Sequence, residues 1–234
     1  MAETDLNKKI TSFLDSALQK NLAGDYDDSI RDLKAAEVLD KNNPEILYNL
    51  GINHARKGLY RTASGYFERL VNLSATYVDI FTVRKLLAYS LIRLKDYARA
   101  EEQLDETIRL APSDVAAHSM MGYTLEKKGD LAGAITAYRT ILELDKKNHN
   151  ACNSLAYILA KLGRNLPEAL RLARSASESV KNSVAYMDTL GYVYLKMGDL
   201  RNAALYLGKA GRRLPFSEEI REHIKELKEA MPPR

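Results

Sequence analysis

Histidine and cysteine, which often carry catalysis or bind metals, are few in this sequence. The chain has four histidines and one cysteine, namely His54, His118, His149, His223 and Cys152. Metal sites need several ligands at matched spacing, such as two histidines four residues apart on a helix. No histidine here has such a neighbour, and His149 with Cys152 supplies only two ligands. A glycine-rich phosphate-binding loop is also absent from the sequence. We therefore expect no enzymatic activity, no catalytic residue, no metal and no cofactor.

Two of these residues are better explained as parts of a packed core. His118 and Cys152 fall at positions where a helix should bury its apolar face, and buried cysteines usually behave as small apolar residues. A single cysteine also excludes an internal disulfide and leaves the redox compartment open.

Tyrosines and cations, by contrast, recur at a regular spacing. Tyr89, Tyr123, Tyr157 and Tyr192 follow one another at intervals of 34, 34 and 35 residues, and an arginine or lysine stands four residues after each. Residues four apart share a face of a helix. A tyrosine offers rigid contact area and a hydroxyl, and a nearby cation favours an acidic ligand or a terminal carboxylate. This chemistry suits recognition of a peptide or protein.

The elements that position these side chains belong to a repeat that runs through most of the chain. Its first mark is a small residue at Ala17, Gly51, Ala88, Gly122, Ala156 and Gly191, with spacings of 34, 37, 34, 34 and 35 residues. Seven residues later stands Gly24, Gly58, Lys95, Gly129, Gly163 or Gly198. Glycine readily takes the left-handed conformation that ends many helices, and the aspartate that follows in four repeats can cap the next helix. Each repeat is expected to be a helix, a tight turn and a second helix, with a less favourable turn at Lys95.

The spacing divides the chain into six repeats and two ends. We assign the repeats to residues 10–43, 44–80, 81–114, 115–148, 149–183 and 184–217. Residues 1–9 form an N-terminal lead-in, and residues 218–234 form a C-terminal capping helix and tail. Ser217 can cap that helix, and Ile220, Ile224 and Leu227 give it one apolar stripe. A repeat array needs such a helix to cover its open end.

Residues 47–51, 121–130 and 190–199 carry motifs that resemble tetratricopeptide repeats, and residues 163–170 are similar to bacterial members of that family. The resemblance implies an all-α fold, a right-handed superhelical α-solenoid of six helix-turn-helix repeats with a capping helix. It also implies a scaffold or adaptor that binds a protein or peptide in a concave groove lined by the first helix of each repeat.

Counting from the small residue of each repeat gives three rows on these first helices. The middle row begins at Ile52 and continues through the four regularly spaced tyrosines. The candidate groove residues are Tyr48, Lys85, Ser119, Asn153 and Asp188 in one row, Tyr89, Tyr123, Tyr157 and Tyr192 in the middle row, and Arg56, Arg93, Lys127, Lys161 and Lys196 in the third. Two alternatives stay open, because the tyrosines can belong partly to the core and the cations can simply be solvated.

One subgroup of the family binds the acidic tails of heat-shock chaperones through a clamp of lysine, arginine and asparagine. Of the five corresponding positions only Asn49 matches, and we add it to the candidate groove residues. The other four positions hold Leu14, Leu18, Thr82 and Leu86, which cannot act as the clamp. Chaperone-tail binding at this site is therefore disfavoured.

The interval between the second and third repeats is three residues longer than the usual 34. It contains four apolar residues, Tyr77, Val78, Ile80 and Phe81, which either extend the packing of a helix or form a second contact site.

The net charge of +4 does not by itself indicate a nucleic acid partner. Residues 149–217, however, hold 10 basic and 4 acidic residues. Seven cations expected on the turns and second helices of the last two repeats form a candidate basic patch, Arg164, Arg171, Arg174, Arg201, Lys209, Arg212 and Arg213. The alternatives to a groove-binding scaffold are docking of an acidic surface (nucleic acid or anionic membrane) on this patch, and self-assembly into a homo-oligomer. The sparse aromatics around the patch disfavour nucleic acid.

No apolar run is long enough to cross a membrane, and the first residues lack the apolar core of a signal peptide. These features favour the cytoplasm. A periplasmic or membrane-anchored location would follow if a signal or anchor segment preceded this sequence, so the compartment stays open.

Overall fold

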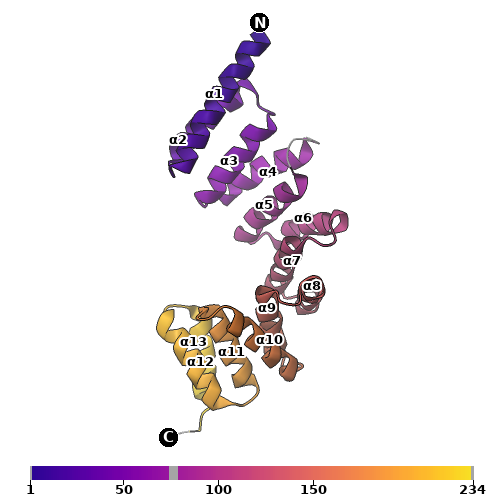
Figure 1. Cartoon of the computed structure of the whole chain (residues 1–234), viewed down its shortest axis with the longest axis vertical. Coiled ribbons are helices and arrows are strands. Elements are labelled where there is room, and N and C mark those ends of the chain that lie inside the picture. The colour runs from indigo at the N-terminus through magenta and orange to yellow at the C-terminus, as the bar shows by residue number, and fades with distance from the viewer. Residues whose placement is uncertain (1, 74–78, 233–234) are drawn as a thin grey trace. The chain divides into compact units, whose positions relative to one another are not determined.

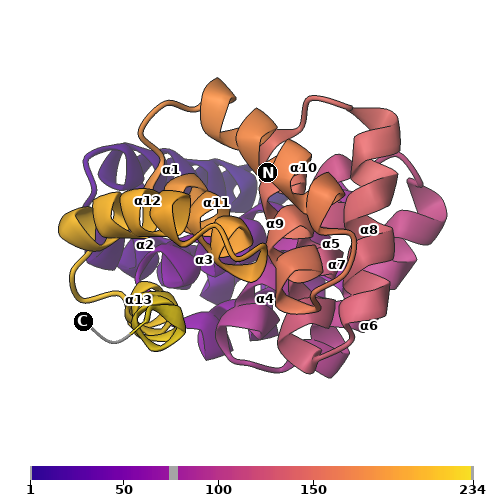
Figure 2. The same ribbon diagram turned by 90° about the horizontal axis from the view of Figure 1, so that it is seen from below.

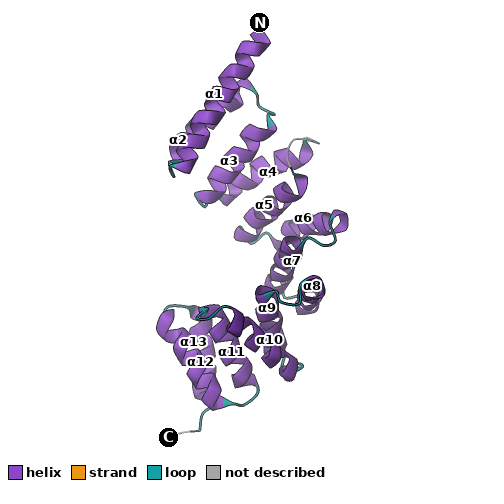
Figure 3. Ribbon diagram, viewed as in Figure 1, coloured by secondary structure: helices purple, strands orange, loops and turns teal. Residues whose placement is uncertain are grey.

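A computed structural model describes residues 2–73 and 79–232 of the chain. Within these ranges it contains 13 α-helices and no strand (Figures 1 and 3). The helices form two compact units, Met1–Lys128 and Gly129–Arg234, which we call unit 1 and unit 2. The all-α repeat fold predicted from the sequence is confirmed.

Unit 1 contains seven helices, in which each helix packs against the next along the chain. Their bounds are α1 (Ala2–Leu22), α2 (Tyr26–Leu39), α3 (Pro44–Arg56), α4 (Tyr60–Asn72), α5 (Ile80–Arg93), α6 (Tyr97–Leu110) and α7 (Val115–Lys128). The odd-numbered helices are the first helices of the repeats, and they carry the predicted rows. Because α1 begins at Ala2, the lead-in at residues 1–9 is largely helical; no glycine or proline interrupts it.

Unit 2 contains the remaining six helices. Their bounds are α8 (Leu131–Leu144), α9 (His149–Lys161), α10 (Leu166–Ser179), α11 (Val184–Lys196), α12 (Leu200–Arg213) and α13 (Glu218–Ala230). Figures 1 and 2 both show α13 beside α12, against which it packs. Ile220 and Leu227 of α13 are buried, as its predicted apolar stripe requires.

The turns within the repeats have the predicted conformation. The five glycines at the second mark have positive φ, and Lys95, which replaces the sixth, also has a φ of 62°. Asp96, Asp130 and Asp199 each accept a hydrogen bond from a backbone amide at the start of the next helix. Asp25, the fourth aspartate of this kind, makes no such bond.

Small residues allow the two helices of a repeat to approach closely. A Cβ atom on Gly51 would lie 2.5 Å from Cε1 of Phe67, and one on Gly191 would lie 2.9 Å from the backbone nitrogen of Leu207. Both distances are below van der Waals contact, so these crossings accept no larger residue.

The two predicted core residues are indeed buried. His118 donates a hydrogen bond from Nε2 to the carbonyl oxygen of Pro112 at 2.8 Å. Cys152 is 1% exposed, and burial raises the pKa of its thiol, which favours the unreactive protonated form. Among the described residues, none of the helices combines the length and apolar character needed to span a membrane.

Candidate partner-binding surfaces

Unit 1 has a pocket of about 420 Å³ between α1 and α3, which we call the N-terminal pocket. Its apolar lining comes from Leu14, Ala17, Leu18, Leu22, Leu33 and Ile52. Its polar lining comes from Asp15, Asn21, Ser29, Glu45, Tyr48, Asn49, Asn53 and Arg56. Leu14 and Leu18, two of the residues at the clamp positions, are therefore part of an apolar floor, and 53% of Leu18 is exposed. Asn49 donates a hydrogen bond to the carbonyl oxygen of Glu45 at 2.9 Å.

A chain of hydrogen bonds forms one wall of this pocket. Arg56 donates to Asn21, and Asn21 donates to Asn53. Asn53 then donates to Ser29 at 3.0 Å, and Ser29 donates to the carbonyl oxygen of Ala17 at 2.7 Å. Asn53 and Ser29 are fully buried, and a satisfied buried network of this kind fixes the side chains that take part in it.

Asn21, Ser29 and Asn53 were not among the predicted groove residues. One signal was present, because Asn53 interrupts an apolar stripe of α3 that includes Ile46 and Leu50. Its partners could not be found in the same way, since they lie on α1 and α2.

The two middle-row tyrosines of unit 1, Tyr89 and Tyr123, are exposed and lie beside cations, whereas Tyr48 is half-buried. Tyr89 is 42% exposed and Tyr123 is 43% exposed. The guanidinium of Arg93 lies 4.4 Å from the ring centre of Tyr60 and 5.8 Å from that of Tyr89. Arg93 also donates a hydrogen bond to the hydroxyl of Tyr89 at 2.8 Å, and this bond raises the pKa of the arginine.

The same arrangement recurs in the neighbouring repeats. Lys127 lies 5.2 Å from the ring centre of Tyr123, and Arg56 lies 5.6 Å from that of Tyr26. We call this surface the tyrosine–cation row and define it as Arg56, Tyr60, Tyr89, Arg93, Tyr123 and Lys127. Tyr60 comes from a second helix and was not predicted.

Arg56 and Arg93 differ from nearby cations in their partners. In the described part of the chain neither makes an ion pair with a carboxylate, whereas Lys57 pairs with Asp27. Lys85, a predicted groove residue, pairs with Asp114. Burial raises the pKa of Asp114, but the bonds from Lys85 and the amide of Ala117 outweigh it and hold that pKa below its usual value. Lys85 therefore links α5 to the start of α7.

The predicted groove residues of unit 2 divide into two groups. On α9, Asn153 and Tyr157 are half-buried, and the exposed Lys161 lies 5.8 Å from the ring centre of Tyr157. On α11, Asp188 and Tyr192 are buried, with exposed fractions of 5% and 6%. The expectation that these last two line an open groove is wrong, because α13 covers them.

Helix α13 makes specific contacts with α11. Nδ1 of His223 lies 3.0 Å from both carboxylate oxygens of Asp188, and its ring stacks on Tyr192 with the ring centres 4.1 Å apart. Glu226 pairs with Lys196, the last cation of the third row. The capping helix thus contacts predicted groove residues of α11 through the imidazole ring of His223 and the carboxylate of Glu226.

The remaining predicted residues are only partly described. Ser119 is half-buried on α7, and Ile80 and Phe81 are half-buried in the first turn of α5. Tyr77 and Val78 lie outside the described residues.

The side chains of the basic patch are exposed on unit 2. Arg174 donates a hydrogen bond to the hydroxyl of Tyr194 at 2.8 Å, and Arg213 donates one to the carbonyl oxygen of Asn182 at 2.8 Å.

Two models of the same repeat family match this chain. A tetratricopeptide repeat model matches residues 85–151 and 119–184, and a second TPR repeat model matches residues 21–58. Together the matches cover more than half of the chain.

Curated relatives have the same repeats but are much longer. The chain is 27% identical to TPR repeat-containing protein PA4667 of Pseudomonas aeruginosa over 128 residues, 55% of this chain and 22% of that protein. It is 26% identical to TPR repeat-containing protein MJ1428 of Methanocaldococcus jannaschii over 148 residues, 60% of this chain and 26% of that protein. The matched region is thus about a quarter of each relative.

Solved structures share the fold at low identity. A structure of PilF from Pseudomonas aeruginosa has a TM-score of 0.73 at 16% identity, covering 95% of this chain and 99% of that one. MamA from Desulfovibrio magneticus RS-1 has a TM-score of 0.67 at 22% identity, with 75% and 98% covered. YrrB, described as a TPR protein with an unusual peptide-binding site, has a TM-score of 0.66 at 18% identity, with 80% and 94% covered. With its matched repeats and its helix-turn-helix fold, this chain belongs to the tetratricopeptide repeat family, a family of generally non-catalytic scaffolds for protein–protein interaction.

Proposed function

We propose that this chain is an interaction scaffold that binds an acidic segment of a partner protein on the tyrosine–cation row of unit 1. The observation that carries the proposal is the environment of Arg93. Its guanidinium lies beside two tyrosine rings and has no carboxylate partner in the described part of the chain. A carboxylate of the partner protein could form an ion pair with this guanidinium.

The charges of the row favour an acidic ligand. An arginine side chain can bind a carboxylate with two parallel hydrogen bonds, and exposed cations on one surface increase the rate of encounter with an acidic partner. Tyrosine and arginine are also the residues that most often dominate binding energy at protein interfaces. Tyr89 and Tyr123 keep enough exposed surface to contribute in this way.

The N-terminal pocket extends the proposed site. Arg56 belongs both to its lining and to the tyrosine–cation row. The apolar floor at Leu14, Leu18 and Ile52 offers a place for an aliphatic side chain of the same ligand. The buried network behind Arg56 limits its motion and so reduces the entropy lost on binding. Peptide binding by YrrB, which shares the fold, supports this class of ligand.

Selection from a random peptide library tests the proposal without knowledge of the natural partner. The full chain is used as bait, and we expect the selected peptides to be rich in aspartate and glutamate. Their affinity should fall about tenfold in an Arg93→Gln/Lys127→Gln variant, because the charged contacts are lost, and should fall with added salt.

The matched control is Arg31→Gln/Arg61→Gln, which removes the same charge from exposed arginines on second helices. This variant should bind the selected peptides as the wild type does. Peptides without acidic enrichment, or an equal loss of affinity in both variants, would refute the proposed site.

A further inference from the structure

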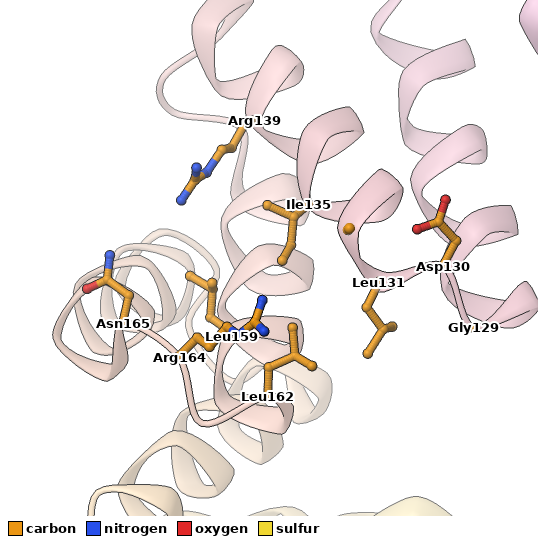
Figure 4. A pocket seen from close by; sticks show the side chains of 10 residues that line it. Gly129, Asp130, Leu131, Ile135, Arg139, Leu159, Leu162, Arg164 and Asn165 are labelled. Carbon is orange, nitrogen blue, oxygen red and sulfur yellow. The ribbon is translucent and has the colours of Figure 1, made fainter.

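Unit 2 contains a hollow of about 620 Å³ between the start of α8 and the turn that joins α9 to α10, which we call the α8 hollow. It is separate from the tyrosine–cation row, since all of its lining residues belong to unit 2. Its aliphatic lining comes from Leu131, Ile135, Leu159 and Leu162. Figure 4 shows these side chains gathered around the hollow, with the Arg164 side chain extending among them from the turn.

An additional residue in the α9–α10 turn helps to form this hollow. The turns between α1 and α2, α3 and α4, α5 and α6, and α11 and α12 each contain three residues, whereas residues 162–165 give this turn four. The additional length is accommodated by Asn165, which has a φ of 44° and is followed by Pro167 in the first turn of α10. The longer turn carries Arg164 to the edge of the hollow.

The two arginines that line the α8 hollow, Arg139 and Arg164, differ in whether they pair with a carboxylate. Arg139 lies 3.3 Å from Glu168, and Asn165 donates to the same carboxylate at 2.6 Å, so this carboxylate is already shared. Asp130 is occupied as the cap of α8, where it accepts from the amide of Gly133 at 2.9 Å. Arg164 is exposed and has no ion pair among the described residues. One cation therefore remains beside an aliphatic floor.

We infer that the α8 hollow is a second binding site, for a protein segment that places an aliphatic side chain on this floor and a carboxylate on Arg164. Half-buried Leu131, Ile135 and Leu162 would lose their remaining contact with water on binding. Exposed Arg171 and Arg174 on α10, which also make no ion pair in the described structure, give the surrounding surface the same preference for an acidic segment.

N-acetyl-leucine is a minimal probe, because it combines an isobutyl group, a peptide bond and a carboxylate. It can be titrated into the full chain while the leucine and isoleucine methyl groups are followed by NMR. We expect saturable shifts at Leu131, Ile135 and Leu162 with a millimolar dissociation constant, as a ligand of this size allows. N-acetyl-leucinamide lacks the charge and N-acetyl-glycine lacks the side chain, so each should bind several-fold more weakly.

Arg164→Gln should weaken binding of N-acetyl-leucine about three- to tenfold, the effect of losing one exposed charged contact. Arg201→Gln removes an equal charge from an exposed arginine of α12, which is not among the lining residues, and should leave the affinity unchanged. Both arginines are exposed, so unchanged methyl spectra elsewhere should show that both variants remain folded.

Three results would overturn the inference. The first is the lack of saturable shifts at about 50 mM probe, well above the expected dissociation constant. The second is equal binding by Arg164→Gln and the wild type. The third is Arg164-dependent binding of octanoate that is more than tenfold tighter than that of N-acetyl-leucine, which would identify a fatty acid and not a protein segment. None of these measurements depends on the row in unit 1.

Discussion

At the scale of single residues, Gly51 sets how closely the helices of the second repeat approach. A Cβ atom there would lie 2.5 Å from Cε1 of Phe67, whose side chain is fully buried. We expect Gly51→Ala to lower the free energy of unfolding by about 1–3 kcal/mol, the usual effect of overpacking a core. Urea denaturation of the purified variant measures this change.

Gly65 provides the control, because it also lies within a helix of the second repeat and a Cβ atom there meets nothing within 4 Å. Gly65→Ala should raise the free energy of unfolding by about 0.5–1 kcal/mol, since alanine loses less conformational entropy in a helix. Similar effects of the two substitutions would show that Phe67 does not constrain Gly51.

A second prediction concerns His54, whose two ring nitrogens are buried without a hydrogen-bond partner among the described residues. Burial, together with the positive charges of Lys34 and Lys57, holds its pKa below the ordinary value of 6.5. The unfolded chain therefore binds a proton before the folded chain does. Stability should be complete above about pH 6.5 and should decrease below it, by about 1.4 kcal/mol for each unit between the two pKa values.

The variant that tests this is His54→Phe, which keeps a ring to stack on Tyr66 and removes the proton-binding group. Unfolding free energies can be compared at about pH 7.5 and about pH 5, above the range in which most carboxylates take up protons. We expect a smaller decrease for the variant than for the wild type. An equal decrease in both proteins would mean that His54 does not contribute.

The residues of the candidate site were only partly predictable. The spacing of tyrosines and cations located Tyr89, Arg93, Tyr123 and Lys127, because a face of a helix is encoded by local periodicity. The buried network of Asn21, Ser29 and Asn53 was not predicted, since its partners are up to 32 residues apart in the sequence. Which side chains meet across helices depends on how the helices rotate against each other, and one sequence does not contain that information directly.

At the scale of elements, the turn between α5 and α6 contains a lysine in the left-handed conformation. Lys95 has a φ of 62°, which is unfavourable for a residue with a Cβ atom. Lys95→Gly should therefore raise the free energy of unfolding by about 0.5–1 kcal/mol, after the greater freedom of glycine in the unfolded chain is included. Thermal or urea denaturation would measure the gain.

The reciprocal substitution lies in the preceding repeat. Gly58 has a φ of 75°, and the nearest atom to an added Cβ would be 4.0 Å away, so any cost is conformational and not steric. Gly58→Ala should lower the free energy of unfolding by about 1 kcal/mol. A loss at Lys95→Gly would show that the lysine makes contacts that outweigh its backbone strain.

The packing of α13 against α11 also explains why two predicted groove residues of α11 are buried. The apolar stripe of residues 218–234 predicted a capping helix, but periodicity could not show which residues of α11 it would cover. Through His223, helix α13 buries Asp188 and Tyr192, whereas the residues at the same repeat positions elsewhere are half-buried or exposed. Helix α13 therefore determines which residues of the sixth repeat are covered on this face.

At the scale of the whole molecule, the fold was predictable because the repeat is encoded many times. Each repeat contains its own turn and its own close helix crossing, as Gly51 and Gly191 illustrate. Stacked repeats interact mainly with their neighbours, so local patterns largely determine the architecture. The choice of partner is not encoded by a repeated pattern of this kind, because it depends on a few exposed side chains such as Arg93.

We expect a partner protein to bind the first-helix surface of unit 1. Photo-crosslinking tests it most directly, with a photoreactive phenylalanine analogue introduced in place of Tyr123 or, as a control, in place of Val38. Both positions are exposed, Tyr123 at 43% on a first helix and Val38 at 77% on a second helix. In extract of the source organism, we predict a discrete crosslinked partner from position 123, lost on prior addition of a selected acidic peptide, and none from position 38. The same partner captured from position 38 and not from position 123 would contradict the account.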